Sequence, residues 1–271
     1  MKALVMLFQL KSLSPLLLVS FTALLLGGIA GPIEQAVGQT VVFQTNLGDI
    51  EVELRPDAAP IAVANFLSYV NSPAGSNYEN TFFHRAVVGL DLSIVQGGGF
   101  FVPVNNVAAA VPTQPPIVNE FGISNTRGTI AFAKMALNPD SATNQWFFNT
   151  ADNSANLDFQ NGGFTVFGSV ISGMDVVDKI QGLDTFNLDA ADPGVFDDVP
   201  LIDATDLVVL NDVILLGDIN MDGNVDFFDI NPFISILSAN TFEAEADFDL
   251  NGTVDFFDIT PFINTLSQLS Q

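Results

Sequence analysis

The stretch FFHRAVVGLDLSIVQGGGF, residues 82–100, holds two short apolar segments, a polar turn between them and three consecutive glycines after them. One basic residue, Arg85, stands in the first segment, and Gln96 ends the second. Short apolar segments that are separated by Gly, Asn and Pro clusters are typical of β-strands joined by turns. The same pattern recurs downstream in GTIAFAK, NQWFFNT, FTVFGSVI and DLVVLNDVILL.

The residues around this series predict a hairpin and two helices. Residues 40–56 alternate apolar and polar side chains on either side of an Asn46–Asp49 turn, which indicates a β-hairpin. Apolar residues at helical spacing over 59–71 predict a helix that stops before Pro73. A second helix is expected over 172–182, opened by Ser172 and closed by Gly182. Many short strands with two helices favour a closed β-barrel with helical plugs.

Five motifs, in this order along the chain, are similar to those of the cyclophilins, especially the bacterial exported kind. They are FFHRAV, VQGGGF, NTRGTIAFAK, SATNQWFF and FTVFGSVISGMDVVDKI. The resemblance covers roughly residues 40–216. It implies a mainly β fold, an eight-stranded antiparallel barrel capped by two helices, and peptidyl-prolyl cis-trans isomerase activity on proline-containing polypeptides, without a cofactor for catalysis.

The resemblance also assigns the site residues. Arg85 matches the catalytic arginine, and its permanent charge and rigid set of donors suit the stabilisation of a twisted amide. Gln96 matches the supporting glutamine, and His84 matches a structural residue. The remaining positions form the proline pocket or contact the substrate backbone: Ile94, Ala133, Gln145, Phe147, Leu157 and Phe164.

Two alternatives stay open at this point. Arg85 could instead form a surface salt bridge with one of the many carboxylates. The loop over residues 88–95 carries about three extra residues and places Ser93 where the family usually has a pocket phenylalanine, although Leu90 or Leu92 could refill the gap. A non-catalytic peptide-binding or structural protein on the same scaffold is therefore the second hypothesis.

A duplicated motif near the C-terminus predicts two calcium loops. DINMDGNVDFFD at 218–229 and DFDLNGTVDFFD at 247–258 place oxygen-bearing groups at loop positions 1, 3, 5, 7, 9 and 12, with Gly223 and Gly252 at the sharp turn. The predicted ligands are Asp218, Asn220, Asp222, Asn224, Asp226 and Asp229 in the first loop, and Asp247, Asp249, Asn251, Thr253, Asp255 and Asp258 in the second.

Each loop runs into one apolar helix, and no clear helix leads into it. This arrangement resembles a type I dockerin, a small α-helical, EF-hand-like pair of calcium loops that binds a cohesin. Positions 10 and 11, often polar in dockerins, hold Phe227 with Phe228 and Phe256 with Phe257. A cohesin-like or other surface partner is expected, and mere stabilisation of the tail is the alternative.

Composition narrows the remaining choices. The net charge is −24, and no Lys or Arg follows Lys179, so nucleic acid is an unsuitable partner. Residues 1–38 have the charged start, apolar run and small residues of a secretory signal, which predicts export from a bacterial cell and no membrane span after cleavage. The chain has no cysteine, so bound calcium would take the structural role of a disulfide. We predict three parts: a signal at 1–38, a barrel at 39–216 and a calcium module at 217–271.

Overall fold

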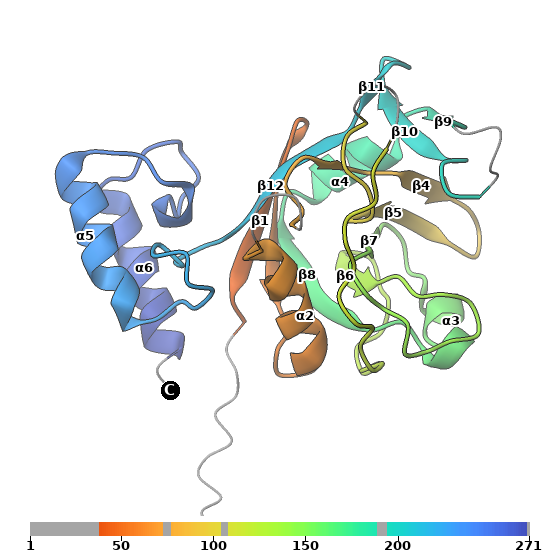
Figure 1. The fold of residues 1–271 in the computed structure, drawn as a ribbon, viewed down its shortest axis with the longest axis horizontal. Helices are drawn as coiled ribbons and strands as arrows, with labels where there is room; N and C mark the ends of the chain where they lie inside the picture. Colours follow the sequence, from red (N-terminus) through yellow and green to blue (C-terminus); the bar gives the residue numbers. More distant parts are fainter. Residues whose placement is uncertain (1–37, 73–76, 104–107, 189–193, 270–271) are drawn as a thin grey trace, which may run out of the picture. The chain divides into compact units, whose positions relative to one another are not determined.

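A nine-stranded antiparallel sheet forms the larger part of the fold, shown as a computed structural model in Figure 1. The structure describes residues 38–72, 77–103, 108–188 and 194–269. The strands follow the order β3-β12-β1-β2-β8-β6-β7-β5-β4. Their bounds are β1 Thr40–Thr45, β2 Gly48–Leu54, β3 Thr81–Phe82, β4 Arg85–Val88, β5 Ser93–Gly97, β6 Thr129–Phe132, β7 Trp146–Asn149, β8 Val166–Ser172 and β12 Val209–Leu215. The predicted hairpin is confirmed, because β1 and β2 pair along their whole lengths.

The sheet curls so that its first and last strands meet at one bend of the chain. These strands are β3 and β4, and only Phe83 and His84 lie between them. The Phe83 amide donates to Val208 beside β12, whereas the His84 amide donates to Gln96 on β5. Within the described ranges the large sheet therefore has nine strands where eight were expected, because the strand that would have closed the barrel breaks in two at this bend. Among the described residues the strand pairing is that of a curled sheet.

Aromatic side chains fill the interior of the curl. Phe43 on β1 contacts Phe66, Trp146 and Phe148, with ring centroids 5.7, 5.0 and 5.4 Å away. All four residues are completely buried. Aromatic pairs in such tilted and edge-on arrangements contribute about 0.5–1.5 kcal/mol each beyond the burial of their surface. Part of the high phenylalanine content of the chain thus fills this core.

Two helices pack against the curled sheet, as predicted. The helix α2, Pro60–Val70, contacts β8 and β12, and α4, Met174–Gln181, contacts β2, β4 and β5. The predicted start of α4 was wrong by one residue: Ser172 ends β8, and Gly173 caps the helix. Gly173 has φ 78°, and a Cβ there would lie 2.2 Å from the Asp49 carbonyl oxygen, so only glycine fits this turn.

A short helical segment and a small second sheet complete this region. The helix α3, Ser154–Leu157, is followed by the 3-10 turn η2, Gln160–Gly162. Residues after α4 form the three-stranded sheet β11-β10-β9, with β9 Thr185–Phe186, β10 Val199–Ile202 and β11 Asp206–Leu207. This sheet rests on an apolar cluster that includes Phe82, Phe196 and Val199. The strands β9 and β10 were not predicted, because this part of the sequence is acidic and only a few of its side chains anchor the strands.

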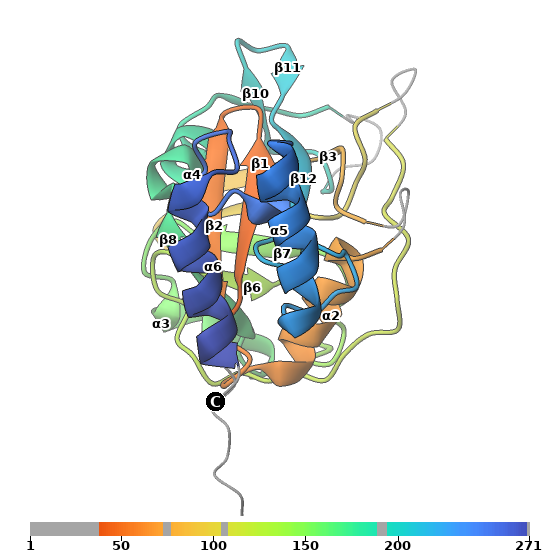
Figure 2. The same ribbon diagram turned by 90° about the vertical axis from the view of Figure 1, so that its left-hand side faces the viewer.

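The C-terminal repeats form two matching loop–helix units. The first contains η3, Phe227–Asp229, and α5, Ile230–Ala239; the second contains η4, Ala244–Ala246, and α6, Phe256–Leu269. The helices α5 and α6 lie side by side in both views (Figures 1 and 2), and Phe233 stacks on Phe262 at 4.4 Å between centroids. These phenylalanines occupy equivalent places in the two repeats, so the duplication in the sequence is also a duplication in the packing.

The predicted signal segment, residues 1–38, lies outside the described residues except for Gly38. In the described part of the chain, no helix has both the length and the apolar character required to cross a membrane.

Candidate functional site

Three predicted site residues and the neighbouring Ala131 form one row across four strands. Arg85 on β4 lies opposite Gln96 on β5, Gln96 lies opposite Phe147 on β7, and Phe147 lies opposite Ala131 on β6. Directly opposite residues of antiparallel strands project from the same face of a sheet, about 5 Å apart. The register of these strands therefore places the arginine and the pocket phenylalanine on one surface, with the glutamine between them.

The predicted proline pocket is a distinct apolar cluster beside this row. Its buried members are Ile94, Ala131, Phe147, Leu157 and Val166, and its half-buried members are Val87, Leu92, Ile123, Ala133 and Phe164. The cluster thus contains the four residues predicted to line the pocket, Ile94, Phe147, Leu157 and Phe164. It also contains Ala133, which was predicted to contact the substrate backbone. Sequence reasoning missed Ala131, Val166, Val87 and Ile123, whose apolar side chains look like ordinary core residues. The rings of Phe147 and Phe164 meet edge-on at 5.8 Å, which gives the pocket an aromatic corner.

The cationic end of the row is partly open to solvent. The side chain of Arg85 is 36% exposed, and its Nε lies 4.0 Å from a carboxylate oxygen of Asp198. The backbone oxygen of Asp198 accepts a hydrogen bond from the Ala86 amide, which fixes this acid beside β4. The surface ion pair considered as the alternative role of Arg85 is therefore present, but it is long and exposed. Such pairs contribute at most about 1 kcal/mol, so the guanidinium keeps its donors available for a ligand.

Gln96 and Gln145 are joined directly. The Nε2 of Gln96 donates to the Oε1 of Gln145 at 2.8 Å, and the Gln145 carbonyl accepts from the Ala133 amide. The amide oxygen of Gln96 is the side-chain atom that could accept from a guanidinium, because an amide nitrogen only donates. Gly99 makes room for this pair, because a Cβ there would lie 2.8 Å from the Gln145 side chain. Gly99, the last glycine of the run at residues 97–99, is therefore needed for this close approach.

His84 has the structural role that the resemblance implied. It is 2% exposed, and its ring contacts Phe100 edge-on at 5.1 Å. Burial lowers its pKa from 6.5 to about 4. The imidazole is therefore neutral at physiological pH, and it has none of the solvent access that a proton-transfer group needs.

A buried asparagine holds the altered loop in place, and no sequence pattern predicted its role. The side chain of Asn153 donates to the Ser93 carbonyl at 2.8 Å and accepts from the Ser93 amide at 2.9 Å. Leu92 then turns toward the pocket, whereas Leu90 is fully exposed. Of the two residues proposed to replace the missing pocket phenylalanine, Leu92 is thus the one that the structure supports.

In the first C-terminal loop, buried carboxylates gather backbone amides. Asp218 accepts from Asp222 and Gly223, and Asp229 accepts from Ile219, Asn220 and Asp226. Asp218 and Asp229 are 2% and 0% exposed. Burial is the main cause that raises the pKa of Asp218. The backbone φ of Gly223 is 90°, as the predicted sharp turn requires.

The second loop repeats this geometry. Asp247 accepts from Asn251 and Gly252, and Asp258 accepts from Phe248, Asp249 and Asp255. Oxygens of Asp247, Asp249 and Asp258 lie within 4.8 Å of one another. Hard divalent cations bind such clusters of oxygen donors at 2.3–2.6 Å. The predicted ligands at both ends of each loop therefore turn inward together.

The paired phenylalanines of the loops point the other way. Phe227 and Phe228 are 66% and 75% exposed, and Phe256 and Phe257 are 77% and 70% exposed. Equivalent positions of the two repeats thus present large apolar side chains to solvent, which is typical of an interaction surface.

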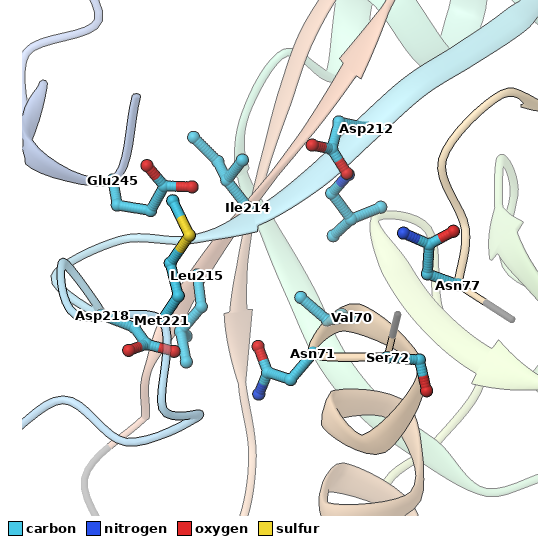
Figure 3. A pocket seen from close by; sticks show the side chains of 11 residues that line it. Val70, Asn71, Ser72, Asn77, Asp212, Ile214, Leu215, Asp218, Met221 and Glu245 are labelled. Carbon is cyan, nitrogen blue, oxygen red and sulfur yellow. The ribbon is translucent and has the colours of Figure 1, made fainter. Parts of the chain in front are cut away.

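A pocket beside β12 has a different chemistry from the row (Figure 3). Three acidic residues line it, Asp212, Asp218 and Glu245, together with Val70, Asn71, Ser72, Asn77, Val213, Ile214, Leu215 and Met221. Burial raises the pKa of Asp212 and of Glu245. The lining includes no basic residue and none of the predicted prolyl-site residues, so this hollow does not belong to the candidate active site.

One family model, several curated proteins and solved structures match this chain. The model of the family "Cyclophilin type peptidyl-prolyl cis-trans isomerase/CLD" matches residues 40–204. The chain is 43% identical over 164 residues to a peptidyl-prolyl cis-trans isomerase of Acinetobacter baylyi, covering 60% of this chain and 82% of that protein. It is 42% identical over 166 residues to peptidyl-prolyl cis-trans isomerase B of Escherichia coli, covering 59% and 92%. A solved Cryptosporidium parvum cyclophilin-type isomerase matches 65% of this chain and 98% of its own at 21% identity, with a TM-score of 0.48.

Proposed function

The chain belongs to the cyclophilin-type peptidyl-prolyl cis-trans isomerases, and we propose that Arg85 is the catalytic cation of its isomerase reaction. The pocket around Phe147 would hold the proline ring of the substrate. The observation that carries this proposal is the strand register that aligns Arg85, Gln96 and Phe147 on one surface. A prolyl ring in the pocket would present its nitrogen toward the guanidinium.

The reaction needs electrostatic help rather than a nucleophile. Partial double-bond character gives a peptide bond a rotation barrier of about 18–20 kcal/mol. When an X-Pro bond twists, its nitrogen regains a lone pair and becomes a hydrogen-bond acceptor. A fixed guanidinium that donates to this nitrogen stabilises the twisted state more than the planar one, which is the condition for catalysis. Arginine suits this role because it stays protonated and its donors are rigidly arranged.

The pocket would contribute orientation. Phe147 and Leu157 are almost completely buried, so the surface that meets the proline is fixed before the substrate binds. Gln145 and Ala133 lie at the side of the row, where the Nε2 of Gln145 and the carbonyl of Ala133 would align the substrate backbone. Fixing the proline ring while the preceding residue rotates lowers the entropic cost of reaching the twisted state.

A protease-coupled assay on an Ala-Ala-Pro-Phe tetrapeptide tests the activity of the full chain. We expect the exchange of the cis prolyl isomer to be faster with the protein than without it. An uncatalysed rate would contradict the isomerase proposal and favour the non-catalytic peptide-binding hypothesis.

We further propose that the C-terminal repeats bind two calcium ions and dock the isomerase to a partner outside the cell. The support is the repeated convergence of carboxylates in both loops and the exposure of the four phenylalanines. The ions would be held by the twelve predicted oxygen ligands, and their role would be structural. Export rests on the signal pattern in residues 1–38.

Thermal unfolding with calcium and with a chelator tests the calcium proposal. Binding to the folded state alone stabilises by about 2.7 kcal/mol per site at a hundredfold excess over Kd. We therefore expect calcium to raise the Tm, and we expect Asp229→Ala with Asp258→Ala to abolish the rise. Asp203→Ala, an exposed acid outside the loops, is the matched control. A Tm that calcium does not change would contradict the proposal.

A further inference from the structure

Lys134 lies behind the proline pocket, and its ammonium group has a complete set of partners. Its Nζ donates to the carbonyl oxygens of Gly163 and Asn161 at 2.5 and 2.9 Å, and to Oδ1 of Asn119 at 3.3 Å. These three acceptors match the three donors of a lysine. Two of them belong to the turn that leads into Phe164, so the lysine fixes the path of the chain just before a pocket residue.

The same ammonium group also contacts the pocket ring itself. The Nζ lies 4.7 Å from the centroid of the Phe164 ring, over its face. A cation within about 6 Å of a ring centroid is attracted by the negative face of the ring. The edge-on contact between Phe164 and Phe147 then continues this interaction to the pocket floor. Lys134, Phe164 and Phe147 thus form a chain of direct contacts from a half-buried cation to the proline site.

The main chain of Phe164 is held independently of the lysine. Its amide donates to the Leu157 carbonyl at 2.9 Å, and its carbonyl accepts from the Asn125 side chain at 3.0 Å. The backbone of Phe164 would therefore stay in place without Lys134, whereas its ring would lose the only cation that lies over its face among the described residues. A change at Lys134 should accordingly affect the orientation of the ring more than the fold.

We propose that Lys134 is a positioning residue for the proline pocket, and that it acts through the ring of Phe164. It does not touch the substrate; it holds the aromatic edge in the orientation that accepts a proline ring. The inference rests on the proposed function, because it assigns Phe164 to the substrate pocket. It predicts an effect on substrate binding rather than on the chemical step, since Arg85 supplies the catalytic donor elsewhere in the row.

A double-mutant cycle on the full chain tests this coupling. The KM and kcat for the Ala-Ala-Pro-Phe tetrapeptide are measured for wild type, Lys134→Met, Phe164→Ala and the double variant, below the melting temperature of each. We expect Lys134→Met to raise KM about fivefold to tenfold with kcat almost unchanged, since methionine keeps the stem but loses the charge and the donors. The double variant should have the KM of Phe164→Ala, because the lysine has no ring left to hold.

Three further variants separate positioning from general stabilisation. Lys134→Arg should keep the KM near that of wild type, because a guanidinium can lie over the ring and donate to the same carbonyls. Lys134→Gln keeps hydrogen-bond donors but loses the charge, and it should raise KM as Lys134→Met does. This variant tests the loss of charge even if Lys134→Met impairs folding. Lys179→Met, an exposed lysine on α4, should leave KM unchanged.

Either of two results would overturn the inference: a KM that does not respond to Lys134→Met or Lys134→Gln, or effects of Lys134 and Phe164 that multiply fully in the double variant. A wild-type chain without isomerase activity would refute the proposed function instead. An active chain whose KM is indifferent to Lys134 would refute only the positioning role.

Discussion

Arg85→Ala should remove most of the isomerase rate while leaving the fold intact. The structural cost is small, because the side chain is 36% exposed and its one ion pair, to Asp198, is 4.0 Å long. Exposed pairs of this kind contribute about 0–1 kcal/mol to the free energy of unfolding. The backbone of β4 keeps its pairing with β5 whichever side chain stands at this position.

The catalytic cost should be much larger. Removing one preorganised donor that acts on the transition state typically costs about 2.7–4 kcal/mol, which is roughly a hundredfold to thousandfold in rate. Arg85→Lys should recover little of this loss. An ammonium on a flexible stem keeps the charge, but it cannot reproduce the fixed directions of the guanidinium donors beside Gln96.

The assay is the protease-coupled rate, with thermal melting of each variant measured in parallel. Asp198→Asn is the matched control, because it removes the same ion pair and leaves the guanidinium in place. If Arg85 served only in that pair, both variants would lose the same small stability and neither would lose activity. Equal rates in wild type, Arg85→Ala and Arg85→Lys would therefore refute the mechanism.

Three other predictions concern the surroundings of the site. Phe147→Ala should lower the free energy of unfolding by about 3–5 kcal/mol and weaken turnover, because the ring is 3% exposed; a loss below 1 kcal/mol in urea denaturation would contradict its place in the pocket floor. Asn153→Ala should cost about 2 kcal/mol in the same measurement, since it removes the partner of the Ser93 amide and the donor to the buried Oδ1 of Asn149, whereas Asn156→Ala, at a half-buried position, should cost less. Burial lowers the pKa of His84 from 6.5 to about 4, so between these pH values the unfolded chain binds more protons than the folded chain. The free energy of unfolding should therefore decrease as the pH falls through this window, by up to about 3 kcal/mol. His84→Gln should flatten this part of the pH profile, and an unchanged slope would show that other groups cause it.

Local patterns in the sequence were sufficient for the elements whose contacts are local. The β1–β2 hairpin and the helix α2 follow from alternation, helical spacing and turn residues within a few positions of one another. The two C-terminal loops at 218–229 and 247–258 are similar, because the carboxylates and the amides that they accept from lie within about one loop length. The motif order also pointed to Arg85, Gln96 and the main pocket residues as candidates, and the structure places them side by side.

Tertiary structure alone decided how these residues meet. The row from Arg85 to Ala131 depends on the register of four strands that are far apart in the sequence, and a shift of one residue would turn each side chain to the other face. The break between β3 and β4 and the roles of Asn153 and Lys134 likewise depend on partners tens of residues away. A polar residue in the sequence does not reveal which distant carbonyl will satisfy it, because that partner is set by the packing of the whole sheet.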